Sequence, residues 1–382
     1  MYIAIHMLIP EEKRRNEHGL SPTISTICVA LLTFAASLAA EASSSVVVFN
    51  DSGFFAADSA RPSQDQLQKL LPGAHLASAN ELRPLLNVPG TRLLVLPYGS
   101  AFPEEAWPDI YQFLQRGGNL LVLGGRPFTR AAHRDSAGWH LRDYSVRFTR
   151  PLGIDQYQVT PGSDGLKFRP NPDLALQLSR FAWKRAFSPV IRLSAVDLYG
   201  RGGSAGSIDA RLDALAWGSR DGRKLAAPVL QVDHLRNGFD GGRSVFLNAE
   251  LTPDFYSKEE TSDLIRSLAQ QALRGSEEFT VRPLLPLYLP GEPVQLDIVW
   301  HSSEFSATLL TVRITIFPDS QPSSRSVTTV TLPSSQPPVL PAPSTKGLHM
   351  IEAELLEGDK VRRLYRSGFW MRDEPTSVPA FG

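Results

Sequence analysis

Short apolar runs alternate with amphipathic stretches over the first two thirds of the chain. Residues 44–50 (SSVVVFN), 91–99 (TRLLVLPYG) and 119–125 (NLLVLGG) have the continuous apolar pattern of buried strands. Between them, residues 61–73 and 102–118 have helical spacing, and both stretches end at glycine. Buried strands separated by helices are typical of a parallel sheet that is covered on both faces. The pattern predicts a doubly wound α/β domain with a mostly parallel sheet, as in flavodoxin-like or amidotransferase-like folds.

The alternation is lost over residues 127–206, which are rich in arginine, proline, glycine and aromatic residues. We expect an insertion with little regular structure there. Order returns over residues 212–251, where the turns SRDG and GFDGG separate three strand-like runs. An amphipathic helix is predicted over residues 257–275, with a capping box formed by Ser257 and Glu260. With a start at residue 43, the α/β domain is therefore predicted to end at residue 275.

From residue 276 the pattern changes to alternation of apolar and polar residues, with turn residues between the runs and no helical period. This pattern predicts an all-β domain over residues 276–373, of the immunoglobulin-like sandwich type, followed by a tail over residues 374–382. The proline-rich stretch 333–344 cannot pair inside a sheet, so it is expected to be a loop or an exposed edge.

The N-terminal region has the features of a secretory signal peptide. A basic cluster around Lys13 precedes the apolar residues 24–40, and small residues at Ala40 and Ala42 fit the cleavage site. The sequence predicts a signal peptide over residues 1–42 and a periplasmic or extracellular protein with no membrane segment after cleavage; an uncleaved anchor is the alternative. The single cysteine, Cys28, lies within this peptide. Its removal would exclude cysteine nucleophiles, disulfides and thiolate metal sites together.

The charge balance and the histidines exclude further classes of function. Lys and Arg number 39 and Asp and Glu also number 39, so the chain offers no positive field for a phosphate backbone, and we expect no nucleic-acid partner. No histidine belongs to an H-x-H or H-E-x-x-H motif. Neither a metal site nor a cofactor is predicted.

Two arrangements could carry hydrolytic chemistry. The segment GGSAG places Ser204 in a G-x-S-x-G pattern, which needs a strand before it and a helix behind it to be a nucleophile elbow; its glycines fit a flexible loop as well. Asp51 and Glu250 each follow a predicted strand, at the edge where α/β sheets bind ligands. They could form the carboxylate pair of a glycosidase, or could act as caps and ion-pair partners.

Aromatic residues give a second indication of a ligand. Trp139 and Tyr144 lie in the insertion, together with other aromatic residues at 157, 183 and 199, and flat rings with polar edges suit the faces of sugars. They could equally pack the insertion onto the sheet. Tyr98 and Arg126 follow predicted strands, and Arg126 could hold groups of the insertion or contact a sugar hydroxyl or an acidic ligand.

Residues 91–128 (TRLLVLPYGSAFPEEAWPDIYQFLQRGGNLLVLGGRPF), the run GRSVFLNAEL and the helix ending LAQQALRG resemble the class I glutamine amidotransferase-like fold. The resemblance covers about residues 45–275 and is to the divergent form found in secreted bacterial glycoside hydrolases, including the trimerisation domain of some β-galactosidases. Amidotransferases have a cysteine after the strand that corresponds to NLLVLGG. This chain has Arg126 in that neighbourhood, so the resemblance does not imply glutaminase activity.

The resemblance and the domain pair lead to one expectation of function. A sandwich after such a domain resembles the region that precedes the catalytic barrel in larger glycoside hydrolases. We expect a secreted bacterial accessory protein, non-catalytic and associated with carbohydrate binding or processing, with possible homo-oligomers through the α/β domain. It could instead be the front part of a longer glycoside hydrolase. Two further alternatives stay open, a hydrolase that uses Ser204 or Asp51 with Glu250, and a structural or adhesion module.

Overall fold

The computed structural model describes residues 45–174, 176–192, 209–236, 238–289, 291–303, 309–334, 337–341 and 343–372. The predicted signal peptide with Cys28, the segment around Ser204, the aromatic residue at 199 and the predicted tail lie outside these residues. In the described part, no helix is both long enough and apolar enough to cross a membrane.

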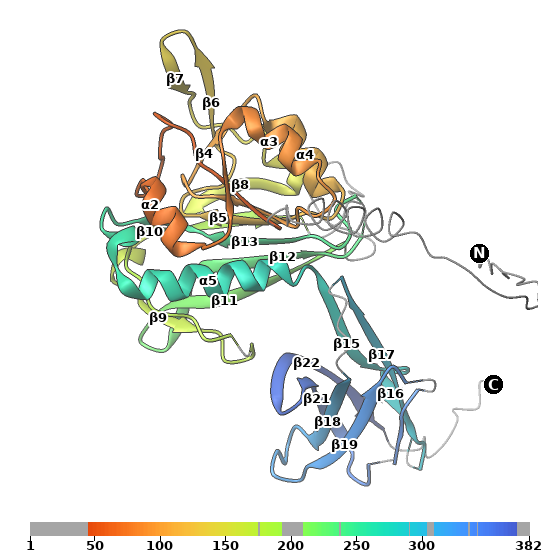
Figure 1. Cartoon of the computed structure of the whole chain (residues 1–382). Coiled ribbons are helices and arrows are strands. Elements are labelled where there is room, and N and C mark those ends of the chain that lie inside the picture. Colours follow the sequence, from red (N-terminus) through yellow and green to blue (C-terminus); the bar gives the residue numbers. More distant parts are fainter. Residues whose placement is uncertain are drawn as a thin grey trace, which may run out of the picture. The chain divides into compact units, whose positions relative to one another are not determined.

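The described chain is mostly β, with several sheets and four α-helices (Figure 1). The helices are α2 (Gln64–Leu70), α3 (Ala79–Leu86), α4 (Trp107–Gln115) and α5 (Glu259–Leu273), with 3-10 turns η1 (Arg150–Leu152), η2 (Ser163–Gly165) and η3 (Phe255–Ser257). The strands before α5 are β1 (Val46–Phe49), β2 (His75–Ala77), β3 (Leu93–Leu96), β4 (Ala101–Pro103), β5 (Asn119–Leu123), β6 (Arg130–Asp135), β7 (Gly138–Leu141), β8 (Ile154–Val159), β9 (Lys167–Pro170), β10 (Trp183–Ile191), β11 (Ala210–Arg220), β12 (Arg223–His234), β13 (Arg243–Leu247) and β14 (Ala249–Leu251).

The largest sheet has the strand order β2-β1-β3-β5-β13-β12-β11-β9. Its strands pair in parallel from β2 to β13 and antiparallel from β13 to β9. The second half is antiparallel because β11, β12 and β13 follow one another through turns, without a helix between them. The sheet is thus mixed, and its parallel half is the part that the apolar runs of the sequence predict.

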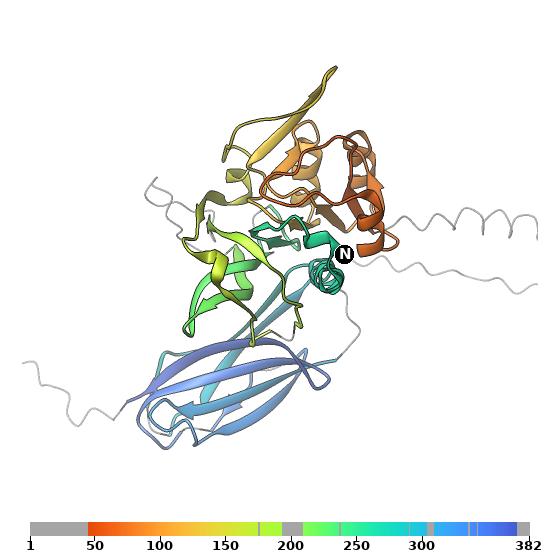
Figure 2. The ribbon, with the colours of Figure 1, turned by 90° about the vertical axis from the view of Figure 1, so that its left-hand side faces the viewer.

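Helices cover both faces of this parallel half. Alternate strand residues enter different cores, because successive side chains of a strand point to opposite faces. Val48 and Val95 pack with α2 and α5, whereas Val47 and Leu94 pack with α3 and α4. Figure 1 shows α3 and α4 on one side of the strands and α5 on the other, and Figure 2 views α5 nearly along its axis. The continuous apolar runs of the sequence arise from this double burial.

Three local expectations differ from the structure. The insertion is more regular than expected, because β6 to β10 lie in it; their burial alternates irregularly, which hides them in the sequence. Helix α3 was not expected, since Pro84 lies inside it, but Ser78 and Glu81 form a capping box at its start. At α5 the predicted box is absent, because Lys258 is the N-cap and Ser257 belongs to η3.

The part after α5 is all β in its described residues (Figure 2). Its strands are β15 (Glu277–Pro283), β16 (Leu287–Tyr288), β17 (Val294–Ser302), β18 (Leu310–Pro318), β19 (Ser326–Leu332), β20 (Val339–Leu340), β21 (Gly347–Glu357) and β22 (Lys360–Met371). They form the sheets β15-β17-β20 and β16-β22-β21-β18-β19, and side chains of both enter one core. The short β20, from the proline-rich stretch, lies at a sheet edge.

A buried ionic network links β22 to the large sheet. The guanidinium of Arg363 lies 2.7 Å from a carboxylate oxygen of Asp233, 2.8 Å from Asp213 and 2.9 Å from Glu277. Arg243, 1% exposed, pairs with the same Asp233. Burial opposes the ionisation of Glu277, but its two neighbouring guanidiniums outweigh burial and hold the pKa of this carboxyl below its ordinary value. This network is structural, because water barely reaches its charges.

Candidate functional site

The predicted site residues follow the strands of the parallel half. Strands β1, β3 and β5 are parallel neighbours, so Asp51, Tyr98 and Arg126, which come after them, lie at the carboxyl edge of one sheet. Glu250 belongs to β14, directly after β13. The structure thus places these candidates near one edge, but their individual contacts differ.

Arg126 forms the centre of a polar cluster at this edge. Its Nε and one Nη lie 3.1 and 2.8 Å from Oδ2 of Asp58, and the side chain of Arg126 is 22% exposed. Ser100 donates its hydroxyl to the same Oδ2 at 2.7 Å, and its Oγ accepts from the backbone N–H of Arg126. The hydroxyl of this serine therefore holds the turn both as a donor and as an acceptor.

Aromatic rings lie against the guanidinium of Arg126. Its central carbon is 4.8 Å from the ring centre of Tyr144 and 5.1 Å from that of the buried Phe187. Tyr144 is 42% exposed, so part of its ring faces solvent beside the charged cluster. Tyr157 is oriented inward: its hydroxyl has no hydrogen-bond partner in the described structure, and burial raises the pKa of this phenol.

Asp51 is held by its surroundings on both carboxylate oxygens. One oxygen accepts from the backbone N–H of Ala79 at the start of α3, and the other accepts from the indole N–H of Trp139 at 3.3 Å. A carboxylate is favourable at this helix end. Arg134 approaches to 3.7 Å, and its guanidinium lies 5.7 Å from the Trp139 ring centre. Asp51 and Trp139 thus attach the β6–β7 hairpin to the sheet edge, and the hairpin projects from the sheet in Figure 1.

Tyr98 and Glu250 have structural contacts. Tyr98 is 1% exposed and donates its hydroxyl to Asn50, and burial raises the pKa of its phenol. Glu250 accepts from Arg185 at 2.6 Å and lies 3.6 Å from Lys184. Asp51 and Glu250 are thus each held by partners of their own.

The backbone is tightly packed where the two turns of this edge meet. Gly125 has φ +70°, and a Cβ there would lie 2.4 Å from the backbone nitrogen of Ser100. Gly99 has the same φ, and its Cβ would lie 2.2 Å from the carbonyl oxygen of Ala57. Asp58 adopts φ +54° without being glycine, a strained conformation of the kind found at ligand sites and switches. The glycines of NLLVLGG and LPYG are therefore needed for close approach.

Sequence reasoning missed Asp58 and Ser100. Asp58 lies 68 residues before Arg126 in a loop without a motif, so only the fold brings the two together. The sequence contained only a weak signal for Ser100: this serine directly follows the glycine that ends the apolar run TRLLVLPYG.

The histidines of the described residues do not form a metal centre. Within the described ranges, no group of three His, Cys, Asp or Glu side chains is placed to hold a metal ion. Asp233 and His234, neighbours at the end of β12, have separate surroundings: Asp233 joins the buried network, whereas the His234 ring packs on Phe239. Burial lowers the pKa of His234 to about 4, so this ring is neutral at pH 7.

A scan of the chain against protein-family models finds no match. A search of curated proteins also finds no match.

The chain is similar to several solved β-galactosidases. One is the enzyme of Bacillus circulans sp. alkalophilus, with 13% identity, coverage of 79% of this chain and 42% of that one, and a TM-score of 0.31. The enzyme of Rahnella sp. R3 has 14% identity, coverage of 83% of this chain and 44% of that one, and a TM-score of 0.32. The enzyme of Halorubrum lacusprofundi has 14% identity, coverage of 84% of this chain and 40% of that one, and a TM-score of 0.32. This chain spans less than half of each of them. TM-scores of this size support no argument about shared activity.

Proposed function

We propose that this protein is a secreted, non-catalytic accessory protein of carbohydrate binding or processing, and that the carboxyl edge of its parallel strands binds a sugar. The observation that carries the proposal is the cluster around Arg126, where a guanidinium fixed by Asp58 lies under the partly exposed ring of Tyr144. An aromatic ring with fixed charged donors beside it suits a sugar, which has an apolar face and hydroxyl edges.

The same cluster argues against hydrolytic chemistry at this edge. Arg126 is a permanent cation, so it is neither a nucleophile nor a general base. Ser100 is committed to Asp58 and to the Arg126 backbone, and Asp51 and Glu250 are held by different partners. The alternative nucleophile, Ser204, is outside the described residues. Labelling of the protein by a fluorophosphonate probe, abolished in Ser204→Ala, would contradict the non-catalytic proposal.

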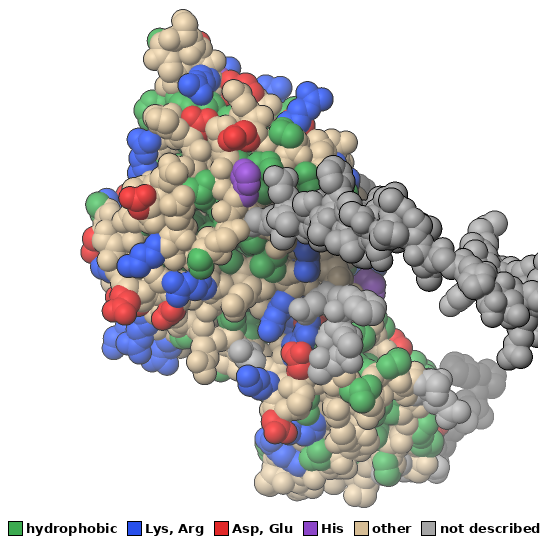
Figure 3. Space-filling model, viewed as in Figure 1, with side chains coloured by type: hydrophobic (Ala, Val, Ile, Leu, Met, Phe, Trp, Pro, Cys, Tyr) green, Lys and Arg blue, Asp and Glu red, His purple; other side chains and the backbone are tan. Residues whose placement is uncertain are grey.

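Further parts of the proposal rest on the sequence. They are the doubly wound, amidotransferase-like assignment of the part before residue 276, the cleaved signal peptide, a periplasmic or extracellular location, and homo-oligomers formed through the α/β part. Acidic and basic side chains are interspersed on the face drawn in Figure 3. That nucleic acid is not a partner stays a prediction from the charge balance of the sequence.

Binding of glycans by wild type and by Tyr144→Ala tests the sugar site. A glycan array identifies a ligand, and calorimetry with that ligand should show about tenfold weaker binding by Tyr144→Ala, because a stacking face is lost. Trp370→Ala is the matched control, since Trp370 is 56% exposed and lies in β22, and it should bind as wild type does. Absence of glycan binding, or equal binding by wild type and Tyr144→Ala, would overturn the proposal.

A further inference from the structure

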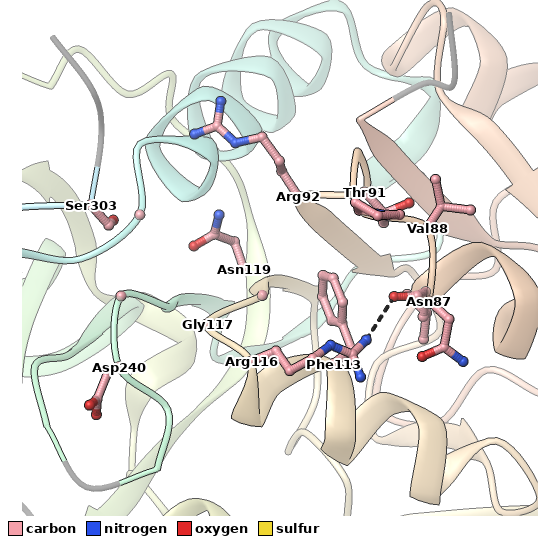
Figure 4. A pocket seen from close by; sticks show the side chains of 15 residues that line it. Asn87, Val88, Thr91, Arg92, Phe113, Arg116, Gly117, Asn119, Asp240 and Ser303 are labelled. Atoms are coloured by element: carbon pink, nitrogen blue, oxygen red, sulfur yellow. Dashed lines mark hydrogen bonds between the residues drawn. The ribbon is translucent and has the colours of Figure 1, made fainter. Parts of the chain in front are cut away.

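A cavity of about 610 Å³ opens where β3, β5 and β13 begin, but its side chains share no binding point. In Figure 4, Arg116 turns to the carbonyl of Leu86, to which it donates at 3.0 Å, and Asp240 points away from the cavity. Helices α3, α4 and α5 end beside the cavity, and the partial negative charge of their last carbonyl groups disfavours an anion. For these two reasons the cavity does not define a ligand.

Hydrogen-bonding groups without partners lie instead along the main chain of β19 (Ser326–Leu332), labelled in Figure 1. Within the described residues this strand pairs with β18 alone and is the edge of the sheet β16-β22-β21-β18-β19. Its N–H and C=O groups that point away from β18 have no hydrogen-bond partner among those residues. Pro341 lines a cavity of about 280 Å³ together with Ser326, at the start of β19, and a proline has no N–H to donate to this edge. The edge of β19 can therefore accept another strand.

The composition of β19 differs from that of the other edge strands. Edges are usually kept from pairing with other chains by short length, charge or proline. In the part of the chain that the structure describes, the edges β2, β4, β7, β14, β16 and β20 have at most four residues, β9 contains Lys167 and Pro170, β8 contains Asp155 and β15 contains Glu277. Strand β19 has seven residues, all of them Ser, Val, Thr or Leu, and its Val327 is 57% exposed. It is thus a long edge without these protections.

A second copy of the chain fits this edge. Two β19 strands bring no like charges together, and their Val and Thr side chains are β-branched, which favours pairing across strands. The nearest charge in sequence is Arg325, which donates to the carbonyl of Pro322 and lies 5.0 Å from the ring centre of Phe317. In an antiparallel pair the two Arg325 side chains lie at opposite ends, whereas in a parallel pair they meet. Charge therefore favours antiparallel pairing of two copies.

We propose that two copies of this chain associate through their β19 strands, antiparallel about Thr329. Thr329 is the middle residue of the strand, so this register engages the whole edge and places Thr329 opposite Thr329 of the second copy. The sheet then continues from one copy into the other. One pair of strands buries less than the roughly 1,200 Å² of a stable interface, so we expect a dissociation constant in the micromolar range. This interface is separate from the proposed sugar site and from oligomers formed through the α/β part.

Sedimentation velocity of the purified protein, from about 1 to 100 µM, tests the proposal. The wild type should pass from monomer to dimer over this range. Thr329→Lys places two ammonium groups opposite each other at the two-fold axis, so it should weaken the dimer at least about tenfold, and Thr329→Glu should do the same. A mixture of the two variants should recover the dimer, because opposite charges then meet. The side chain of Thr329 is exposed, so both variants should fold as the wild type does.

Gln295→Lys is the matched control. Gln295 is an exposed residue of β17, which has a neighbouring strand on both sides, so the added charge should leave the dimer unchanged. The proposal is overturned by a wild type that stays monomeric at about 100 µM, or by a mixture of Thr329→Lys and Thr329→Glu that does not associate. Oligomers that form equally in wild type and in Thr329→Lys arise from another surface and also overturn it.

Discussion

Arg126 and Arg363 both pair with carboxylates, but their environments differ. Arg126 pairs with one carboxylate at a sheet edge and is 22% exposed, beside an aromatic ring that faces solvent. Arg363 is 2% exposed and pairs with three carboxylates from different strands. In the first case donors and a ring remain accessible to a ligand, whereas in the second every charge is neutralised inside the protein. Access to water, and not the residue type, separates a candidate binding group from a structural one.

Among the substitutions that test this comparison, replacement of Arg363 should have the largest effect on the free energy of unfolding. Arg363→Ala should lower the free energy of unfolding by about 3–5 kcal/mol, because it leaves the carboxylates of Asp213, Asp233 and Glu277 buried without their main cation. Urea denaturation followed by circular dichroism measures this change.

The matched control for Arg363 lies three residues further along β22. Arg366 pairs with Glu352 and Asp173 but is 49% exposed, so Arg366→Ala should cost no more than about 1 kcal/mol. Similar losses for the two variants would show that the buried network is not the stabilising feature described above.

A smaller effect is expected from pH. The pKa of Glu277 lies below its ordinary value of 4.5, so the unfolded chain takes up this proton at a higher pH than the folded protein does. The stabilisation is therefore complete above about pH 4.5 and is lost as the pH falls through the folded pKa. Glu277→Gln should be about 1–3 kcal/mol less stable than wild type at pH 7. In urea titrations from pH 7 to pH 3, this difference should shrink below pH 4.5; a constant difference would contradict the assignment.

The smallest effect on stability is expected at the carboxyl edge. Arg126→Gln should change the free energy of unfolding by no more than about 1 kcal/mol, since its single ion pair is partly exposed. Arg185→Gln, which removes an exposed ion pair to Glu250, is the control and should have an effect of similar size. A loss for Arg126→Gln close to that of Arg363→Ala would place Arg126 among the structural arginines and would weaken the sugar-site proposal.

The sequence predicted best what depends on local pattern. The runs of β1, β3 and β5 are continuously apolar because both faces of these strands are buried, and this placed Asp51, Tyr98 and Arg126 at one edge. Partners distant in sequence were not predictable: Asp233 and Arg363 are 130 residues apart and meet only through the fold. The strands of the insertion were missed because their half-exposed sequences have no clear period.

The two turns that meet at the carboxyl edge also limit how this protein could be changed in evolution or by engineering. Installing a thiol nucleophile by Gly125→Cys would place a Cβ 2.4 Å from the backbone nitrogen of Ser100, and 2.7 Å from its hydroxyl, at a φ of +70°. At residue 125, a single substitution therefore cannot introduce the nucleophile; the loop that carries Ser100 would have to move first, and the anchor of Asp58 with it. A thiol at residue 125 therefore requires coupled changes in two loops.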